Sequence, residues 1–186
     1  NRHQAATLHW ACQFLGVVNV PLNWRAKSDE IDYCLADAEA KAVFFDASSE
    51  EATGASGGAR ALPRIGVGPL ESKDSTCDWE ALLAGPASPL QAAADAEDLS
   101  LMLYTSGTTG KPKGVPRRHR QERAAALAHV AQNLYRRGER TLGVMPLYHT
   151  MGVRSLLAMA LVDGVFVCMP RFDTQEAGAD RGRAPD

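Results

Sequence analysis

The chain of 186 residues is 45% hydrophobic and 23% charged, with a formal net charge of −2 at pH 7. This length and composition predict about one globular domain with a proper core, and they exclude a disordered chain. The near-neutral charge gives no reason to expect nucleic acid or an anionic membrane as a partner. No apolar run approaches the roughly 18 residues that a membrane-spanning helix needs.

The cysteines are widely scattered and form no C-x-x-C pair, so neither a metal site nor a disulfide framework is indicated. We expect free thiols in a reducing compartment. No segment has the layout of a signal peptide, and a cytoplasmic location is therefore predicted. The four cysteines are Cys12, Cys34, Cys77 and Cys168.

The first third of the chain alternates helical and extended patterns. Apolar residues at helical spacing over 8–15 predict a helix that ends at Gly16, a residue suited to a left-handed cap. The β-branched run 17–22 then predicts a buried strand, and 41–46 predicts another. Ser28 is the expected N-cap of the helix between them, because acidic residues follow it in the first turn. The expected buried face of that helix comprises Ile31, Cys34, Leu35 and Ala38.

The middle of the chain contains the strongest strand signal, LSLMLY at 99–104. Before it, the small residues of 52–60 predict a loop, and 64–68 predicts a short strand. After it, a glycine-rich loop follows at once, and a helix is expected near 119–137. The apolar face expected for that helix comprises Leu127, Val130, Ala131 and Leu134, with Gly138 at its end.

Strands and helices continue to alternate as far as residue 169. Residues 141–147 predict a strand, 152–162 predict an apolar helix stopped by Gly164, and 165–169 predict a further strand. Several of these strands are apolar on both faces, which is typical of a mostly parallel sheet flanked by helices, so the predicted class is α/β. Such sheets bind ligands at the carboxyl ends of their strands, where the loop after 99–104 lies.

The stretch YTSGTTGKPKG at 104–114 concentrates glycine, hydroxyl and lysine residues. Such a composition is compatible with an ordinary solvated loop. It also has what a polyphosphate needs, namely glycines that let backbone N–H groups approach closely, hydroxyl donors and compact positive charge. The glycines are Gly107 and Gly110, the hydroxyl residues are Thr105, Ser106, Thr108 and Thr109, and the lysines are Lys111 and Lys113.

The spacing of this loop counts against an ordinary P-loop. That motif needs four residues between its glycines and a helix directly after its lysine, whereas only two residues separate Gly107 from Gly110. Pro112 follows the lysine, has no N–H to offer a phosphate, and pushes Lys111 toward an extended conformation. We therefore expect the loop to lead into an extended segment.

The loop YTSGTTGKPKG resembles, at every position, the signature loop of the adenylate-forming superfamily, which includes acyl- and aryl-CoA synthetases. A second stretch, MPLYHTMG at 145–152, is similar to the P-L-[FY]-H-x-x-G segment of that family. The leading segment 8–46 resembles the helix–strand–helix–strand that precedes the loop. The resemblance covers residues 1–173 and implies part of the large N-terminal domain of the family.

The resemblance implies a two-step reaction with ATP, Mg²⁺ and coenzyme A. A carboxylic acid substrate first joins the α-phosphate of ATP with release of pyrophosphate, and a thiol then takes the acyl group. Catalysis of the first step is positioning and charge neutralisation. The implied phosphate-loop residues are Thr105, Ser106, Gly107, Thr108, Thr109, Gly110 and Lys111, completed by Lys113 and Gly114. Lys111 is the implied catalytic residue, Tyr148, His149 and Gly152 are implied beside the acyl pocket, and no metal ligand is predicted in the chain.

The segment from 145 to 167 is most similar to aryl-CoA ligases of the halobenzoate type. Two basic features leave alternatives open. Arg154 either reaches solvent with a buried stem or contacts a substrate carboxylate. The basic cluster at Arg117, Arg118 and Arg120 is either a solvated face or an anion-binding site.

The adenine, ribose and C-terminal lysine motifs of the family have no candidate before Asp186, and the chain starts at Asn1 within a helical pattern. Residues 174–186 predict a divergent, disordered tail. We therefore expect a fragment that lacks the C-terminal domain, is inactive alone and self-associates through truncated edges. The alternatives are a non-catalytic remnant that binds phosphate or a partner chain, and a P-loop hydrolase.

Overall fold

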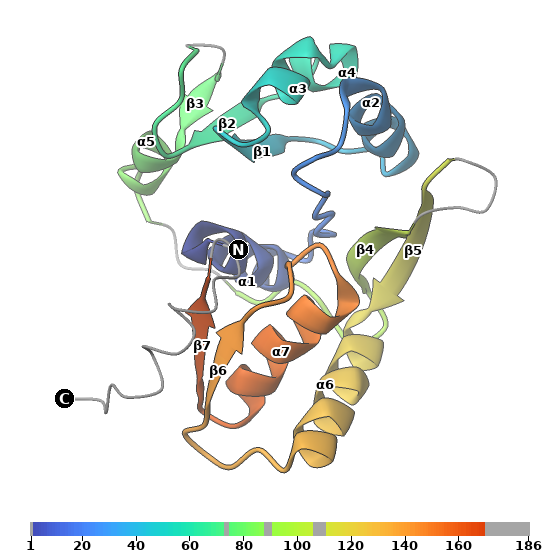
Figure 1. The fold of residues 1–186 in the computed structure, drawn as a ribbon, viewed down its shortest axis with the longest axis vertical. Coiled ribbons are helices and arrows are strands. Elements are labelled where there is room, and N and C mark those ends of the chain that lie inside the picture. The colour runs from blue at the N-terminus through green and yellow to red at the C-terminus, as the bar shows by residue number, and fades with distance from the viewer. Residues whose placement is uncertain (1, 73–74, 88–90, 106–110, 170–186) are drawn as a thin grey trace. The chain divides into compact units, whose positions relative to one another are not determined.

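The computed structural model describes residues 2–72, 75–87, 91–105 and 111–169 (Figure 1). The chain folds into two compact units. The first unit comprises residues 1–19, 93–100 and 117–186, and the second comprises residues 20–92 and 101–116.

The second unit is built on a three-stranded parallel sheet in the order β1-β2-β3. Its strands are β1 (Val43–Asp46), β2 (Arg64–Val67) and β3 (Cys77–Asp78). Its helices are α2 (Ser28–Asp37), α3 (Glu50–Ala55), α4 (Gly57–Arg60) and α5 (Trp79–Leu83). Apolar side chains from the sheet and from α2, α4 and α5 form its core: Ile31, Cys34, Phe45, Ala59, Ile65, Val67 and Trp79.

The first unit pairs two parallel strands, β6 (Arg140–Gly143) and β7 (Val165–Cys168). Its helices are α1 (His3–Leu15), α6 (His119–Asn133) and α7 (Thr150–Leu161), and α6 packs against α7. The buried apolar residues of α6, α7 and their flanking segments are Ala126, Leu147, Val153, Leu156, Ala158, Met159 and Met169.

Strands β4 (Leu99–Thr105) and β5 (Lys113–Arg118) pair with each other. They flank the glycine-rich loop, and both contain residues of each unit. The α/β class with parallel strands and flanking helices is confirmed, as are the predicted strands at 41–46, 64–68, 99–104 and 165–169. Gly16 ends α1 with φ of 66°, as predicted for a left-handed cap.

Two short predictions are wrong. Residues 17–22 form no strand; Asn19 makes only an isolated bridge, its N–H donating to the Ser100 carbonyl at 3.0 Å, and Pro21 has no N–H to continue a ladder. Residues 52–60 form α3 and α4 rather than a loop. Ser56 begins α4, because its hydroxyl oxygen accepts a hydrogen bond from the Ala59 N–H at 2.9 Å.

The prediction for α2 is nearly correct. The helix begins at Ser28, so Lys27 is its N-cap, and the Lys27 N–H donates to the Glu30 carboxylate at 3.0 Å. Ile31 and Cys34 are buried as predicted, whereas Leu35 is only half-buried. The acidic first turn, not a serine cap, satisfies this helix end.

The predicted buried face of α6 is wrong. Leu127 is 49% exposed and Leu134 is 82% exposed, whereas Glu122 and Ala126 on the neighbouring face are buried. One residue turns a helix by about 100°, so the apolar set lies one position away from the face that packs. The helix also ends at Asn133, earlier than predicted, because Leu134 adopts the left-handed conformation.

The last two elements of the first unit are close to their predictions. Strand β6 stops at Gly143, so the predicted strand 141–147 is too long; residues 144–149 form a turn instead. Helix α7 begins two residues before the predicted start and ends one residue before the predicted end. Among the described residues, no helix is long and apolar enough to cross a membrane.

Candidate functional site

The glycine-rich loop leaves the end of β4, as the sequence predicts. Thr105 is the last residue of β4 and its side chain is exposed. Ser106, Gly107, Thr108, Thr109 and Gly110 lie outside the described residues, so their predicted roles stay predictions.

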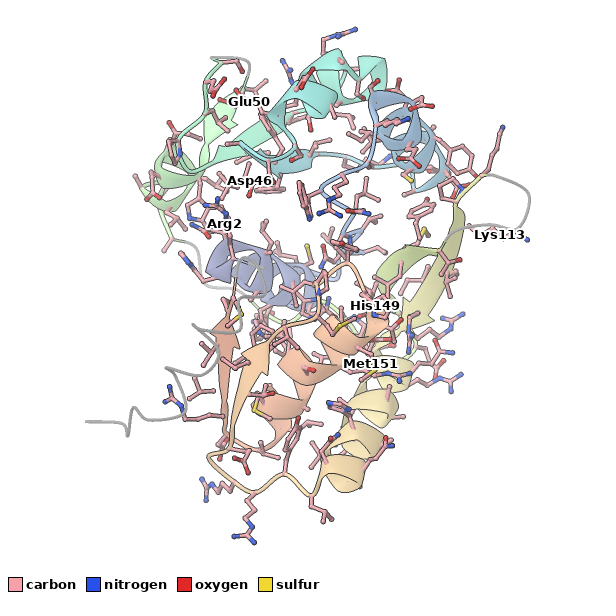
Figure 2. The ribbon with its side chains drawn as sticks, in the orientation of Figure 1. Arg2, Asp46, Glu50, Lys113, His149 and Met151 are labelled. Carbon is pink, nitrogen blue, oxygen red and sulfur yellow. The ribbon has the colours of Figure 1, made fainter. Side chains whose placement is uncertain are left out.

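The loop returns to the described chain at Lys111, whose exposed ammonium nitrogen lies 5.7 Å from the centroid of the Tyr33 ring on α2. Pro112 follows and β5 begins at Lys113 (Figure 2), so the predicted extended segment is confirmed. Proline cannot supply the N–H that a helical continuation would use, and it favours an extended residue before it. The loop is therefore a strand–loop–strand connection, unlike a P-loop.

Tyr104 fastens the end of β4 to α2 within the second unit. Its hydroxyl donates to the Asp37 carboxylate at 2.7 Å and lies 3.3 Å from the Cys34 carbonyl oxygen. Burial, followed by the hydrogen bond to Asp37, raises the pKa of Tyr104 well above its ordinary value, so the phenol stays protonated and remains a donor. The residue before Thr105 is thus held by a side chain 67 positions away in the sequence.

Gly114 has a packing role that sequence reasoning missed. A Cβ at this position would lie 2.9 Å from the Met102 sulfur and 3.2 Å from an Asp37 carboxylate oxygen. Glycine therefore lets β5 approach β4 and α2 closely. Whether Gly114 also touches phosphate stays a prediction, because the close approach alone accounts for the residue type.

The structure brings Tyr148, His149 and Gly152 together at the start of α7. The His149 N–H donates to the Pro146 carbonyl at 2.9 Å, which closes a tight turn. Gly152 is buried beneath this turn: a Cβ there would lie only 2.1 Å from the Pro146 carbonyl oxygen. Tyr148 is half-buried beside it. Glycine is therefore required at position 152, because only its missing side chain lets the segment around Pro146 pack directly on the start of α7.

His149 is the N-cap of α7, and its ring is exposed (Figure 2). Its Nδ1 accepts a hydrogen bond from the Met151 N–H at 3.3 Å. Because Nδ1 accepts, the neutral ring carries its proton on Nε2. The turn thus presents an imidazole N–H donor to solvent at the positive end of a helix dipole.

Exposed apolar residues stand near His149 in the sequence. Val144, Met145 and Met151 are 43%, 38% and 37% exposed, and all three lie within seven residues of His149. An N–H donor beside apolar surface suits a ligand with one polar end and an apolar body.

The two groups of predicted site residues belong to different units. Thr105, Lys111, Lys113 and Gly114 lie in the second unit, and Tyr148, His149 and Gly152 lie in the first.

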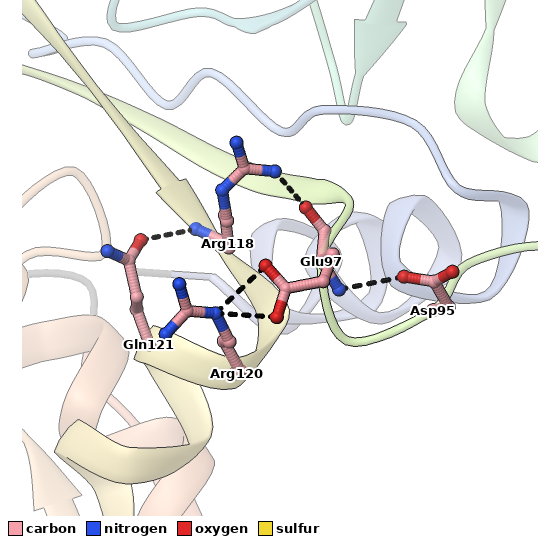
Figure 3. A network of polar contacts seen from close by, with 5 residues as sticks. All are labelled: Asp95, Glu97, Arg118, Arg120 and Gln121. Carbon is pink, nitrogen blue, oxygen red and sulfur yellow. Dashed lines mark hydrogen bonds and ion pairs between the residues drawn. The ribbon is translucent and has the colours of Figure 1, made fainter.

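The arginines of the basic cluster after the loop have partners within the chain, two of them carboxylates (Figure 3). The Arg120 Nε lies 2.8 Å and 3.0 Å from the two carboxylate oxygens of Glu97. The Arg118 guanidinium donates to the Glu97 carbonyl oxygen, and the Arg118 N–H donates to the Gln121 side chain at 2.8 Å. Arg117 contacts Glu122. Arg118 and Arg120 are exposed, as a solvated face predicts, whereas Arg117 is largely covered and contacts the buried Glu122, which neither alternative predicted.

The described residues contain no candidate metal site. Within residues 2–72, 75–87, 91–105 and 111–169, no group of three or more His, Cys, Asp or Glu side chains is placed to hold an ion. The four cysteines are free thiols, as predicted, and only Cys34 among them is fully buried.

The chain is similar to ligases over nearly its whole length. It is 30% identical over 173 residues to the long-chain-fatty-acid–CoA ligase FadD13 of Mycobacterium tuberculosis, which covers 93% of this chain and 34% of that protein. The chain therefore spans about a third of the length of the curated relatives it matches.

Solved structures agree with this similarity. A putative long-chain-fatty-acid CoA ligase from Rhodopseudomonas palustris superposes with a TM-score of 0.84 at 22% identity, covering 97% of this chain and 45% of that one. ATP-bound MatB from the same organism gives a TM-score of 0.81 at 26% identity, covering 99% of this chain and 36% of that one.

The family described as AMP-binding enzyme matches residues 1–181. Together with the strand–loop–strand geometry of the glycine-rich loop and the fold of the two units, this match identifies the chain as a member of the AMP-binding, adenylate-forming enzyme family, corresponding to part of its N-terminal domain.

Proposed function

We propose that this chain is the part of an ATP-dependent carboxylic acid–CoA ligase that holds the phosphates of ATP. The observation that carries the proposal is the glycine-, threonine- and lysine-rich loop at the carboxyl end of β4 in a chain of the AMP-binding family. The full reaction would join a carboxylate to the α-phosphate, release pyrophosphate and pass the acyl group to coenzyme A.

The described residues on either side of the loop suit a polyanion. Thr105, Lys111 and Lys113 are exposed, so a hydroxyl and two ammonium groups flank residues 106–110. Tyr104 fixes the strand that carries Thr105, which reduces the entropy lost on ordering the loop around phosphate. These residues supply charge neutralisation and orientation, with Lys111 as the catalytic residue.

The acyl substrate belongs with the turn at the start of α7. The Nε2–H of His149 is placed to donate to a carboxylate oxygen, while Val144, Met145 and Met151 offer apolar surface to the rest of the acid. This arrangement supports an aryl or alkyl carboxylic acid as the substrate class. A preference for halobenzoate-like acids remains a prediction.

ATP, Mg²⁺ and coenzyme A are the proposed cofactors. The loop fits phosphate oxygens by its donor types, whereas the described residues offer no carboxylate cluster for Mg²⁺. We place the protein in the cytoplasm, in keeping with its free thiols.

The polypeptide of 186 residues is expected to bind ATP through its phosphates without activating acids. It spans about a third of the length of its relatives, and the expected adenine, ribose and C-terminal lysine motifs have no candidate in its sequence. Two measurements on the purified chain test this: calorimetric titration with ATP and Mg²⁺, and pyrophosphate exchange with a panel of aryl and fatty acids.

Matched lysine variants make the binding test specific. Lys111→Ala removes a loop cation, whereas Lys41→Ala removes another exposed cation elsewhere in the second unit. A charge-assisted contact predicts a loss of about tenfold in ATP affinity for Lys111→Ala only. Equal losses in both variants, or no binding by the parent chain, contradict the phosphate role. Robust pyrophosphate exchange contradicts the expected inactivity.

A further inference from the structure

Glu122 is a buried carboxylate that neither the phosphate loop nor the acyl-pocket residues explain. It lies in the first turn of α6 and is 4% exposed. A buried carboxylate is tolerated when cations satisfy it, because leaving water costs the charged form much of its stabilisation. Two arginines from other elements of the first unit supply this charge: Arg117 and Arg154.

Arg117 lies at the end of β5. Its guanidinium contacts the Glu122 carboxylate directly, and its side chain is only 19% exposed. Four residues earlier, β5 begins at Lys113, directly after the glycine-rich loop and Pro112. The contact therefore fixes the far end of the strand whose other end carries the loop lysine.

Arg154 lies on α7 and is half-buried, with a buried Nε that has no hydrogen-bond partner among the described residues. Burial raises the pKa of the Glu122 carboxyl above its ordinary value, and the positive charges of Arg117 and Arg154 act in the opposite direction. Helix α7 is the element that packs most extensively on α6. Since α7 begins with the His149 cap and the buried Gly152, its position determines where the His149 ring lies.

The three charges thus join three elements within one unit. The Glu122 carboxylate on α6 contacts Arg117 at the end of β5 and interacts electrostatically with Arg154 on α7, and neither arginine side chain is fully exposed. Apolar contacts would tolerate sliding of one element along another, but a buried ion contact is satisfied only when the charged groups stay aligned. Arg154 is half-buried with a buried Nε, which fits the alternative of a covered stem, and its charge acts on the Glu122 carboxyl; contact with a substrate carboxylate stays a prediction.

We propose that Glu122 is a positioning residue, whose buried carboxylate holds the end of β5 and the start of α7 in one fixed arrangement through Arg117 and Arg154. Its importance for catalysis rests on the proposed function, because β5 carries Lys113 and α7 carries His149. The mechanical coupling itself does not depend on that function.

Amide hydrogen exchange on the purified chain tests the coupling without any ligand. Glu122→Gln keeps the shape of the side chain and removes its charge. We expect Glu122→Gln to raise the frequency of opening at residues 115–118 and at 150–154, and this rise should exceed the rise in the interior of α6 by at least about tenfold. The His149 ring signal, assigned with a His149→Asn variant, should shift in the NMR spectrum of Glu122→Gln.

Two single-partner variants separate coupling from general loosening. Arg117→Gln should open only the end of β5, and Arg154→Gln should open only the start of α7 and shift the His149 signal. Ala126→Gly is the control, since Ala126 is 1% exposed on the same helix and outside the charged group. It should raise exchange across α6 without selecting β5 or α7.

Each outcome of the exchange experiment either supports or overturns the proposal. If Glu122→Gln does not fold, the two arginine variants still give the pattern that supports or overturns the proposal. A uniform rise in all three charge variants, matching Ala126→Gly, overturns it, and so does an unchanged His149 signal in Arg154→Gln.

ATP titration then separates this inference from the proposed function. If the parent chain does not bind ATP, the phosphate role is refuted, but the hydrogen-exchange result still supports the coupling. If the parent chain binds ATP, Glu122→Gln should bind at least about threefold more weakly than Ala126→Gly, whereas equal affinities refute positioning of the loop strand.

Discussion

Replacing Gly152 by alanine tests whether the turn before α7 depends on the absence of one side chain. The new Cβ would lie 2.1 Å from the Pro146 carbonyl oxygen and 2.7 Å from the Met145 carbonyl oxygen, whereas real contacts of this kind are not found under 3.0 Å. Both atoms belong to backbone, so the whole turn must retreat from the helix. The His149 cap, which depends on that turn, must move with it.

The expected cost follows from three terms. Overpacking of a rigid contact costs about 1 to 3 kcal/mol. Weakening the cap of α7 costs about 1 kcal/mol more, while alanine in place of glycine within a helix returns about 1 kcal/mol. We therefore expect Gly152→Ala to lower the free energy of unfolding by about 1 to 3 kcal/mol.

Urea unfolding followed by circular dichroism measures this loss, with Gly57→Ala as the control. Gly57 also lies in a helix, but a Cβ there would meet nothing within 4 Å. The control should change the free energy of unfolding by no more than about 0.5 to 1 kcal/mol, in either direction. Equal stability of Gly152→Ala and the parent chain would refute the reasoning, and so would an unmoved His149 signal in its NMR spectrum.

Three further predictions concern the first unit. Burial lowers the pKa of His9 from 6.5 to about 4, so the unfolded chain binds the proton more readily than the folded chain between these two pH values. The free energy of unfolding should therefore fall by about 3 kcal/mol as the pH drops from 6.5 to 4. His9→Gln should flatten this part of a pH series of urea unfolding curves. Leu134→Gly should raise the free energy of unfolding by about 1 kcal/mol, because Leu134 has φ of 54° and is 82% exposed; a less stable variant in the same assay contradicts the assigned cap. The chain should self-associate through the exposed face of α6, so Leu127→Glu should lower the weight-average mass in sedimentation at high concentration, whereas a parent chain that stays monomeric refutes the association.

Local sequence signals predicted most of the strands and the boundary of the loop. Strand β4 could be recognised because its apolar run is long and ends in glycine and threonine residues. Pro112 predicted the extended exit, since its ring constrains the backbone wherever it stands. Gly16 predicted the end of α1 for a similar reason. These features depend on a few neighbouring residues, which is why one sequence suffices for them.

The failures involve partners that are distant in the chain. The helices at 50–60 form because the Asp32 carboxylate on α2 accepts from the Gly58 N–H at 2.8 Å and from the Ser56 hydroxyl at 2.5 Å. Glycine and serine otherwise favour loops, so propensity alone predicted one. Residues 17–22 show the opposite case. Their β-branched composition favours a strand, but only the Asn19 N–H forms a bridge to another segment, at Ser100.

In the candidate site too, local sequence identified the residues, whereas distant contacts explain their types. The sequence selected Gly114 and Gly152 as members of two motifs, but the reason for glycine at each became visible only from what surrounds it: Met102 and Asp37 at one, the Pro146 carbonyl at the other. The basic cluster could not be resolved from its charges, because Glu97 lies more than 20 residues before its arginine partners.

The sequence by itself determined which family motif the glycine-rich loop resembles, because its hydroxyl, glycine and lysine residues are contiguous and their order is sufficient to recognise it. Only the tertiary structure decided which face of α6 is buried. That choice depends on what packs against the helix: α7 packs on it and Arg117 contacts the buried Glu122, while the more apolar face with Leu127 remains exposed. Hydrophobic periodicity measures the apolar character of a helix face, and it contains no information about a charge partner contributed by another element.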